Sequence, residues 1–263
     1  MRSAELSGGC PRRLRVIVLP SYALSMALLP WGERPLHQTE NAPLPAPLTL
    51  DVGAKLDVGA RAAALGRRLL DVVMALVLIV ITLPVMIVVA AAVLIDSGWP
   101  MLYQARRQGQ GGRPFRLLKF RSMWRNSERQ LGELLELDEL FRIQYDSTHK
   151  ILRDPRCTRI GQVLRRSSLD ELPQLFNVLA GHMSLIGPRP YSFLELDGRV
   201  EARELLSVPP GMTGLWQVSG RSHIDFERRI VLELAYVRTR SWRLDLAIAA
   251  RTLAAVVTRR GAY

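Results

Sequence analysis

Two adjacent carboxylates near the middle of the chain are the residues best suited to chemistry. Asp170 and Glu171 are neighbours, and Arg165 and Arg189 lie close to them in sequence. A carboxylate pair facing arginines fits phosphoryl transfer, in which a carboxylate binds Mg2+ or attacks phosphorus while arginines hold the nonbridging oxygens. A structural interpretation also exists, because Ser168 and Glu171 match a helix capping box and Asp170 would interact favourably with the helix dipole. These residues alone permit both interpretations.

Arg189 has an unusual sequence context. It lies between Pro188 and Pro190, whose φ angles are fixed by their rings. Such flanking residues would leave the guanidinium little conformational freedom, which favours a role in binding an anion. As a turn alone, the same segment would need no functional explanation.

The composition excludes some classes of site and leaves several classes of partner open. Two widely separated cysteines, Cys10 and Cys157, predict neither a disulfide framework nor a zinc module. The net charge of +12 suits nucleic acid, an anionic membrane or phosphorylated substrates. We discount the charge itself, because nearly all the basic residues are arginines and genome base composition can produce that skew. No nucleic-acid-binding module is recognisable and aromatic residues are only 6%, so we expect no nucleic-acid partner.

An uncharged block must place these residues at a membrane. Residues 72–95 are 24 consecutive positions without a charge. As one helix they would be ~36 Å long, against ~30 Å for the hydrocarbon core. Pro84 removes a backbone donor near the middle and leaves halves that each reach only ~16 to 18 Å. Arginines flank the block on both sides, so both flanks favour the cytoplasmic side.

We therefore expect residues 61–99 to form a basic flank and a re-entrant membrane helix hairpin, with Pro84 as the break in the helix. Lys55 and Arg113 would then lie on the same face of the membrane. A tilted single span is the main alternative, because membrane helices tolerate proline. A buried helix of a soluble core is a second alternative.

Residues 100–263 are expected to form a small cytoplasmic domain. Its first part has two short extended runs, Met101–Ala105 and Pro114–Phe120, around a glycine-rich turn. This pattern predicts a β-hairpin just outside the membrane.

The rest of this domain is predicted to be helical. Residues 127–145 read as a polar helix, and the capping box at Ser168 predicts a helix that ends at Gly181. Two amphipathic runs, one starting at Phe226 and one at residues 242–258, either pack against the core or lie on lipid. The predicted fold class is therefore α+β and mainly helical: a re-entrant membrane helix hairpin, a short β-hairpin and amphipathic interfacial helices.

The first 60 residues have a different character. They contain seven of the sixteen prolines and show no sustained helical or strand period. We expect residues 1–60 to be a disordered tail or linker.

Several segments together resemble one known family, the bacterial sugar transferases, which are monotopic polyprenyl-phosphate phosphoglycosyl transferases. The resemblance covers about residues 65–263. The segments that carry it, in order, are Arg67-Arg-Leu-Leu-Asp71, the proline-broken apolar block, Lys119-Phe-Arg-Ser-Met123, Ser168-Leu-Asp-Glu-Leu-Pro-Gln174, Gly181-His-Met-Ser-Leu-Ile-Gly-Pro-Arg-Pro190 and Pro210-Gly-Met-Thr-Gly-Leu-Trp-Gln217.

The resemblance implies a two-step reaction. Asp170 would attack the sugar-proximal phosphate of a UDP-sugar, release UMP and hold a covalent phosphosugar, which undecaprenyl phosphate then takes. Asp170 and Glu171 would be the catalytic pair, with Mg2+ bound at Asp170. The residues implied to bind substrate phosphate are Arg165, Arg189, Lys119 and Arg121.

The resemblance also implies a place in the cell. The protein would lie in the inner membrane with its catalytic domain on the cytoplasmic face and would begin the synthesis of a surface polysaccharide or glycoconjugate. The expected partners are a UDP-sugar, undecaprenyl phosphate and the lipid bilayer, with a homodimer left open. His182 departs from the family, which often has Asp there, so we do not expect His182 to bind metal. A noncatalytic membrane scaffold is the alternative function.

Overall fold

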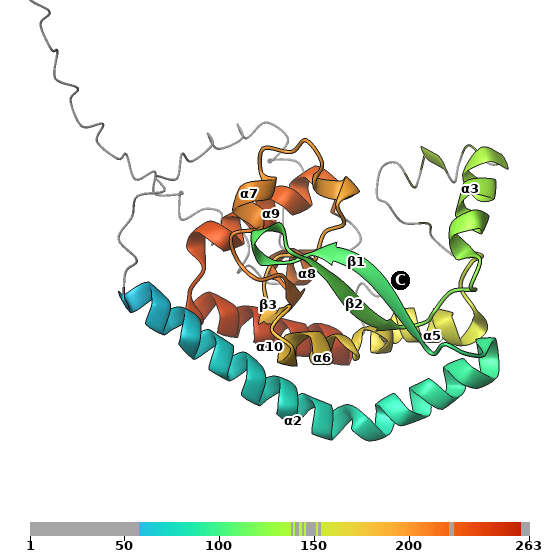
Figure 1. Cartoon of the computed structure of the whole chain (residues 1–263), viewed down its shortest axis with the longest axis horizontal. Helices are drawn as coiled ribbons and strands as arrows, with labels where there is room; N and C mark the ends of the chain where they lie inside the picture. The colour runs from blue at the N-terminus through green and yellow to red at the C-terminus, as the bar shows by residue number, and fades with distance from the viewer. Residues whose placement is uncertain are drawn as a thin grey trace, which may run out of the picture. The chain divides into compact units, whose positions relative to one another are not determined.

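The computed structural model describes residues 58–137, 139, 142, 143, 145, 151, 154–220 and 224–258. The described part is mainly helical with two small sheets, which confirms the predicted α+β class (Figure 1). Residues 1–57, and with them Lys55 and nearly all of the predicted tail, lie outside the described residues. The elements, in order, are α2 (Val58–Ser97), β1 (Leu102–Gln108), η1 (Gln110–Gly112), β2 (Pro114–Phe120), α3 (Ser127–Leu137), α5 (Arg159–Ser167), η2 (Leu169–Glu171), α6 (Gln174–Leu179), β3 (Ser184–Ile186), η3 (Leu194–Leu196), α7 (Ala202–Leu205), β4 (Gly211–Thr213), α8 (Leu215–Ser219), α9 (Phe226–Thr239) and α10 (Trp242–Thr258).

The apolar block forms one helix, α2, that continues through Pro84 for 40 residues. The helix bends in its middle part but does not turn back on itself (Figure 1), so the expected helix hairpin is wrong as a local structure. Pro84 cannot donate to the carbonyl one turn earlier. The hydroxyl of Thr82 donates to the carbonyl of Leu78 at 2.7 Å, a contact that often bends helices. The proline therefore bends the helix without ending it.

The outer face of α2 is apolar and is not covered by the other residues that the structure describes. Residues 62–97 form a helix that by length and composition alone can cross a membrane, and only 17% of its most apolar stretch is buried. A soluble core helix would be mostly buried, so this alternative does not fit. The large exposed apolar side chains on the helix include Leu69, Val73, Leu76, Val80, Ile81, Ile87, Val88 and Ile95.

The inner face of α2 packs against one soluble domain along both of its halves. Before Pro84, Ala75 is fully buried in a cluster with residues of β2 and α6. After Pro84, Val93 is buried in a second cluster that includes Phe120 and Leu164. Both halves therefore belong to the same packed unit.

Two arginines fix the two ends of this packing. Arg68 donates from Nη1 to the carbonyl of Val178 at 2.6 Å and from Nη2 to that of Leu179 at 2.8 Å, at the end of α6. Arg121, after β2, donates from Nη2 to the carbonyl of Ser97 at 2.6 Å, at the end of α2. Each guanidinium thus satisfies carbonyls that a helix end leaves without an intrahelical partner. The arginine motif before the block is therefore a docking contact as well as a basic flank.

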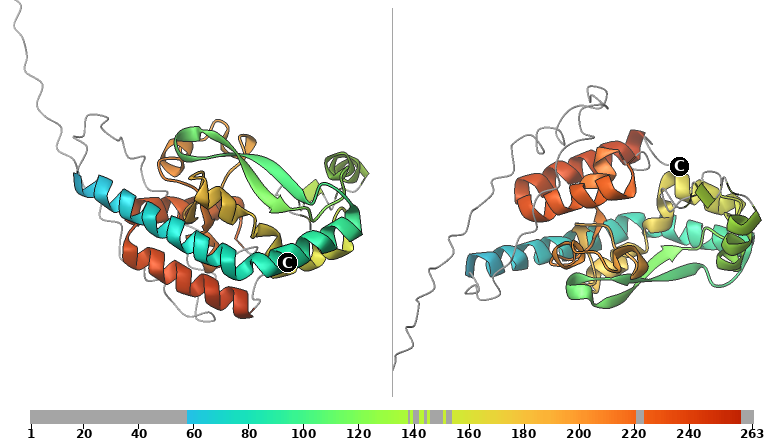
Figure 2. Two further views of the ribbon diagram at one scale, coloured as in Figure 1. Left: turned by 60° about the horizontal axis from the view of Figure 1, so that its bottom comes forward. Right: turned by 90° about the horizontal axis from the view of Figure 1, so that it is seen from above.

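The last helix lies against the start of α2. Arg67 forms an ion pair with Asp245 at 3.2 Å and lies over the ring of Trp242 at 5.1 Å. Figure 2 shows α10 and the β1–β2 hairpin on opposite sides of α2. On α10, Ile248 is buried whereas Trp242 and Leu246 are exposed. The helix therefore has both a core-facing side and an exposed apolar side, and contact of the exposed side with lipid stays a prediction.

The β-hairpin has the predicted form. β1 and β2 pair antiparallel from Leu102 opposite Phe120 to Gln108 opposite Pro114. The turn between them contains Gly111 with φ 68°, a conformation that glycine adopts readily.

The second sheet joins two of the sequence motifs. β3 and β4 pair in parallel, with Ser184 opposite Gly211 and Ile186 opposite Thr213. A Cβ on Gly211 would lie 2.1 Å from the backbone nitrogen of Gly187, so only glycine permits this approach. The Gly-Pro-Arg-Pro and Pro-Gly-Met-Thr-Gly segments therefore meet backbone to backbone.

The predicted capping box at Ser168 is wrong. Ser168 has φ 57°, ends α5, and makes no side-chain capping bond to the turn that follows. The turn η2 comes next, and α6 begins only after Pro173. Pro173 lacks the N–H that a continuous helix would use, so the chain makes i to i+3 bonds instead. The predicted end is near the observed one, since Gly181 has φ 83° two residues after α6.

Helix α5 lies so close to the chain after β2 that only glycine fits at the contact. A Cβ on Gly161 would lie 1.9 Å from the carbonyl oxygen of Ser122. We expect Gly161→Ala to move α5 outward and to lower the free energy of unfolding by about 1–3 kcal/mol. Gly132→Ala in α3 is the matched control, because nothing lies within 4 Å of a Cβ there and alanine should stabilise the helix. Thermal unfolding measures both; equal effects at the two positions would contradict this packing.

Candidate active site

The two candidate carboxylates lie on η2, between α5 and α6. Asp170 is buried, with 8% of its surface exposed, whereas the Glu171 side chain is 40% exposed. Lys119, near the end of β2, forms an ion pair with Glu171, with 2.7 Å between Nζ and Oε1. The structure therefore brings together three of the predicted site residues from two separate motifs.

Burial makes Asp170 an unusual carboxylate. Burial raises the pKa of Asp170 to about 6, and the neighbouring Glu171 acts in the same direction. Lys119 and Arg165 act in the opposite direction and limit the rise. A carboxylate that loses its proton near neutral pH, with little water around it, is well suited to attack an electrophile.

Arg165 approaches the same site from α5. Its Nε donates to the hydroxyl of Ser122 at 3.2 Å, and its Nη1 lies 3.3 Å from the sulfur of Cys157. An additional ion-pair contact of 3.9 Å reaches Asp154. These contacts hold the Arg165 guanidinium in place, and its positive charge acts on Asp170.

The structure assigns Arg121 a different contact from the expected one. Its guanidinium is buried against the carbonyls of Ser97 and Gly98. The sequence motif gave no sign of this, because Ser97 precedes Arg121 by 24 residues. Arg121 therefore caps α2, and its binding of a substrate phosphate stays a prediction.

Arg189 lies in a second cluster. Its backbone N–H donates to Glu233 of α9 at 2.8 Å, and its Nη2 donates to Glu195 of η3 at 3.4 Å. Within the described residues, no hydrogen bond or ion pair joins Arg189 to Asp170. The two halves of the predicted phosphate-binding set are therefore held by different parts of the domain.

Asn177 is a site-building residue that the sequence analysis missed. Its Oδ1 accepts a hydrogen bond from the N–H of Leu118 at 2.9 Å, and its Nδ2 donates to the carbonyl of Arg116 at 2.7 Å. The side chain thus extends the edge of β2 and fixes that strand to α6. This keeps Lys119 opposite Glu171. The signal in the sequence is a single asparagine among the apolar residues of a short helix.

Comparison with known proteins agrees with the motifs. A model of the bacterial sugar transferases matches residues 62–259. The chain belongs to the bacterial sugar transferase family.

The chain is similar to several relatives with related names. It is 44% identical over 198 residues to a UDP-galactose-lipid carrier transferase of Erwinia amylovora, which covers 75% of the chain but only 41% of that relative. It is 36% identical to the exopolysaccharide production protein ExoY of Rhizobium meliloti, over 86% of the chain and 98% of the relative. It is also 36% identical to a UDP-glucose:undecaprenyl-phosphate glucose-1-phosphate transferase of Caulobacter vibrioides, over 86% of the chain and 82% of the relative.

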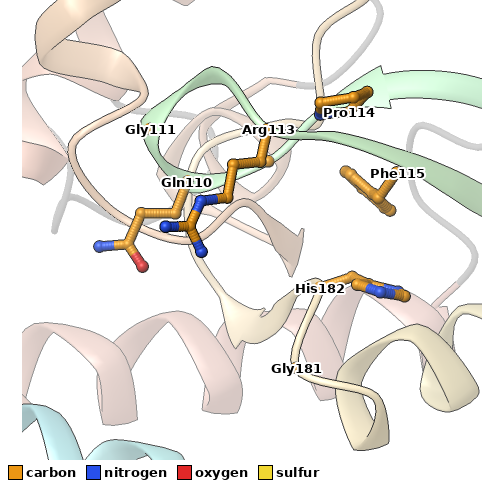
Figure 3. Close-up of a pocket in the computed structure, with 8 residues that line it drawn as sticks. Gln110, Gly111, Arg113, Pro114, Phe115, Gly181 and His182 are labelled. Atoms are coloured by element: carbon orange, nitrogen blue, oxygen red, sulfur yellow. The ribbon is translucent and has the colours of Figure 1, made fainter.

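A cavity of about 350 Å³ lies beneath the turn of the β-hairpin (Figure 3). Gln110, Arg113 and Phe115 line it from the hairpin, and His182 lines it from the segment after α6. The His182 ring stacks on that of Phe115, with 5.7 Å between centroids. Neither Asp170 nor Glu171 is among the described residues that line this cavity, so it is distinct from the carboxylate pair. That His182 binds no metal stays a prediction.

The donors at the carboxylate pair fit Mg2+. Within the described residues, no group of three or more His, Cys, Asp or Glu side chains could hold a metal ion by itself. Mg2+ is commonly bound by one or two carboxylates together with substrate phosphates and water. Asp170 and Glu171 supply two such carboxylates, and the raised pKa of Asp170 shows a buried anion that a cation would stabilise.

The raised pKa of Asp170 has a consequence for stability. A carboxyl group whose pKa rises on folding contributes stability at low pH, and this contribution is lost as the pH rises through about 6. Asp170→Asn should therefore gain melting temperature relative to the parent as the pH is raised from 5 to 8 in EDTA. Thermal unfolding at both values checks this. A difference in melting temperature between variant and parent that is constant with pH, or that changes in the opposite direction, would show that burial does not raise the pKa of Asp170.

Proposed function

We propose that the protein transfers a sugar 1-phosphate from a UDP-sugar to undecaprenyl phosphate through a covalent intermediate on Asp170, and releases UMP. The observation that carries the proposal is the buried Asp170 beside Glu171, with Lys119 at 2.7 Å from that glutamate, on a domain packed along an apolar helix. The names of the relatives from Erwinia and Caulobacter support a UDP-sugar donor and a lipid acceptor.

The reaction has two displacements at one phosphorus atom. A carboxylate oxygen of Asp170 attacks the sugar-proximal phosphorus, an O–P bond forms, and the bond to the departing UMP breaks. An oxygen of undecaprenyl phosphate then attacks the same phosphorus, and the bond to Asp170 breaks. The products are undecaprenyl diphosphate sugar and UMP, with the Asp170 carboxylate restored.

The charges at the site suit two anions that must approach each other. Lys119 and Arg165 place positive charge near Asp170, which lowers the repulsion between its carboxylate and the diphosphate. Mg2+ bound at Asp170 would neutralise further phosphate charge. Glu171 holds Lys119 in position, and Arg189 would bind a nonbridging oxygen of the donor.

The attachment of α2 supports a re-entrant topology. The contacts at Arg68 and Arg121 tie both ends of the helix to one domain, and both halves pack on that domain. A domain with this attachment cannot lie outside the bilayer while its helix crosses from one face to the other. We therefore infer that α2 enters the inner membrane from the cytoplasmic side and leaves on that side. Its exposed face would contact lipid, which places Asp170 near the headgroup phosphate of the acceptor.

The expected biological role is to begin the assembly of a surface polysaccharide. The ExoY relatives of Rhizobium meliloti and Sinorhizobium fredii are named for exopolysaccharide production. A noncatalytic scaffold would have no use for a buried carboxylate with a raised pKa next to an ion pair, so the site geometry favours an enzyme.

The proposed nucleophile is tested by substitution and by trapping. Asp170→Asn should abolish UMP release, because an amide cannot attack the phosphate, whereas Glu171→Gln should slow turnover with the fold retained. Mass spectrometry of a reaction with UDP-sugar and no acceptor should find the phosphosugar on Asp170. Glu133→Gln, on α3 and with a side chain that is 54% exposed, serves as a control for the loss of a surface carboxylate. Substantial turnover in Asp170→Asn, or an adduct on another residue, would refute the mechanism.

The metal requirement is tested by removal and replacement. Exhaustive EDTA treatment should abolish UMP release, and Mg2+ should restore it better than Zn2+, because oxygen donors surround the site. His182→Ala should leave the concentration of Mg2+ needed for half-maximal activity unchanged. Full activity in EDTA would exclude the metal, and a weakened response to Mg2+ in His182→Ala would show that His182 takes part in binding it.

A further inference from the structure

The segment that carries Arg189 has only one backbone N–H available to hold it. Pro188 and Pro190 have none, so across these three residues only Arg189 can donate from the main chain. That N–H donates to Oε1 of Glu233 at 2.8 Å. One carboxylate therefore holds the middle of this rigid segment.

The same carboxylate also holds the residue after Pro190. The hydroxyl of Tyr191 donates to Oε2 of Glu233. Both side chains are fully enclosed, each with 1% of its surface exposed. Glu233 thus binds the chain on both sides of Pro190 and uses both of its oxygens to do so.

The guanidinium of Arg189 is held much more loosely than its backbone. Its bond to Glu195 is long, at 3.4 Å, while Glu195 makes shorter bonds of 3.0 Å with Arg107 and 2.7 Å with the N–H of Ser192. The Arg189 side chain is 24% exposed. Because the Arg189 backbone is fixed and its guanidinium is weakly bound, the guanidinium can exchange Glu195 for a phosphate without movement of the main chain.

Burial of the ionised Glu233 carboxylate at this position costs free energy. Burial raises the pKa of Glu233 to about 7, with the hydrogen bonds from Tyr191 and Arg189 acting in the opposite direction. The guanidinium of Arg229 lies nearby on the same helix and stacks over Trp216 at 4.3 Å. An apolar residue would fill the same space without the free-energy cost of burying a charge. Packing alone therefore does not explain a carboxylate at this position.

We propose that Glu233 is a positioning residue for the reaction: by binding the Arg189 N–H and the Tyr191 hydroxyl, it sets the place from which the Arg189 guanidinium meets the phosphates of the sugar nucleotide. The inference rests on the proposed function. Glu233 does not touch the substrate, and it acts only through Arg189.

The test is a double-mutant cycle between Glu233 and Arg189, read as the KM for UDP-sugar and the KM for undecaprenyl phosphate. Glu233→Ala should lower kcat/KM for UDP-sugar by about tenfold to 100-fold, with the KM for the lipid acceptor unchanged. In the Arg189→Ala background, the same substitution should add less than about a twofold loss, because the group that it positions is already gone.

Two further variants keep the test decisive if Glu233→Ala does not fold. Glu233→Gln keeps the shape and one acceptor, and Tyr191→Phe removes one of the two bonds, so both should show smaller losses confined to the UDP-sugar. Glu204→Gln is the matched control. It weakens the pair between Glu204 of α7 and Arg238 of α9, the helix that also carries Glu233. This pair has bonds of 2.7 and 2.8 Å and does not touch the Arg189 segment.

The outcomes separate this inference from the proposed function. The positioning role would be overturned if the Glu233 substitutions lowered kcat/KM for UDP-sugar equally in the presence and absence of Arg189. It would also be overturned if they affected the kinetics of both substrates equally. In either case, UMP release by the parent protein would still support the proposed function. No UMP release by the parent protein from any UDP-sugar would overturn the function and the inference together.

Discussion

The attachment of both ends of α2 to a single domain is the constraint on which the rest of the structure depends. Arg68 reaches the end of α6, and Arg121 reaches the end of α2 itself, so the long apolar helix is fixed at two distant points. The elements between these points, η2 and α6, carry the candidate active site. The geometry of the carboxylate pair is thereby set relative to the apolar face of the helix.

The elements that carry the site are too short to be stable by themselves. Helix α6 has 6 residues and η2 has 3, well below the length at which an isolated helix forms in water. Side chains and close backbone contacts replace the missing local stability. Asn177 joins α6 to β2, and Gly161 and Gly211 permit backbones to touch where a Cβ would collide. These contacts explain why the motifs contain so many glycines and buried polar residues.

Local patterns in the sequence predicted much of the fold. Two short extended runs on either side of a glycine-rich turn predicted the β-hairpin, and the absence of charge predicted the apolar helix. The adjacent carboxylates were also found from sequence, and Lys119 from its motif. The contacts that the sequence did not predict join residues that lie far apart in the chain. The bond from Arg68 to Val178 spans 110 residues, and that from Arg189 to Glu233 spans 44, and neither partner is marked by a local pattern.

The two local errors have physical causes as well. Pro84 was expected to end a helix, but one lost hydrogen bond is a small cost in a helix supported along both halves by packing. Ser168 matched a capping box, but Pro173 follows too closely for a helix to begin there.

The most direct test of the central claim is the sidedness of the two flanks of α2. Single cysteines replace Lys55, three residues before the helix, and Arg113, in the hairpin turn, in a chain that lacks Cys10; the native Cys157 is buried. Spheroplasts are treated with a maleimide that cannot cross the membrane. The attachment described here predicts that both positions are protected until the membrane is opened, and then both are labelled. Labelling at position 55 in intact spheroplasts, with position 113 protected, would show that α2 crosses the membrane and would contradict the account.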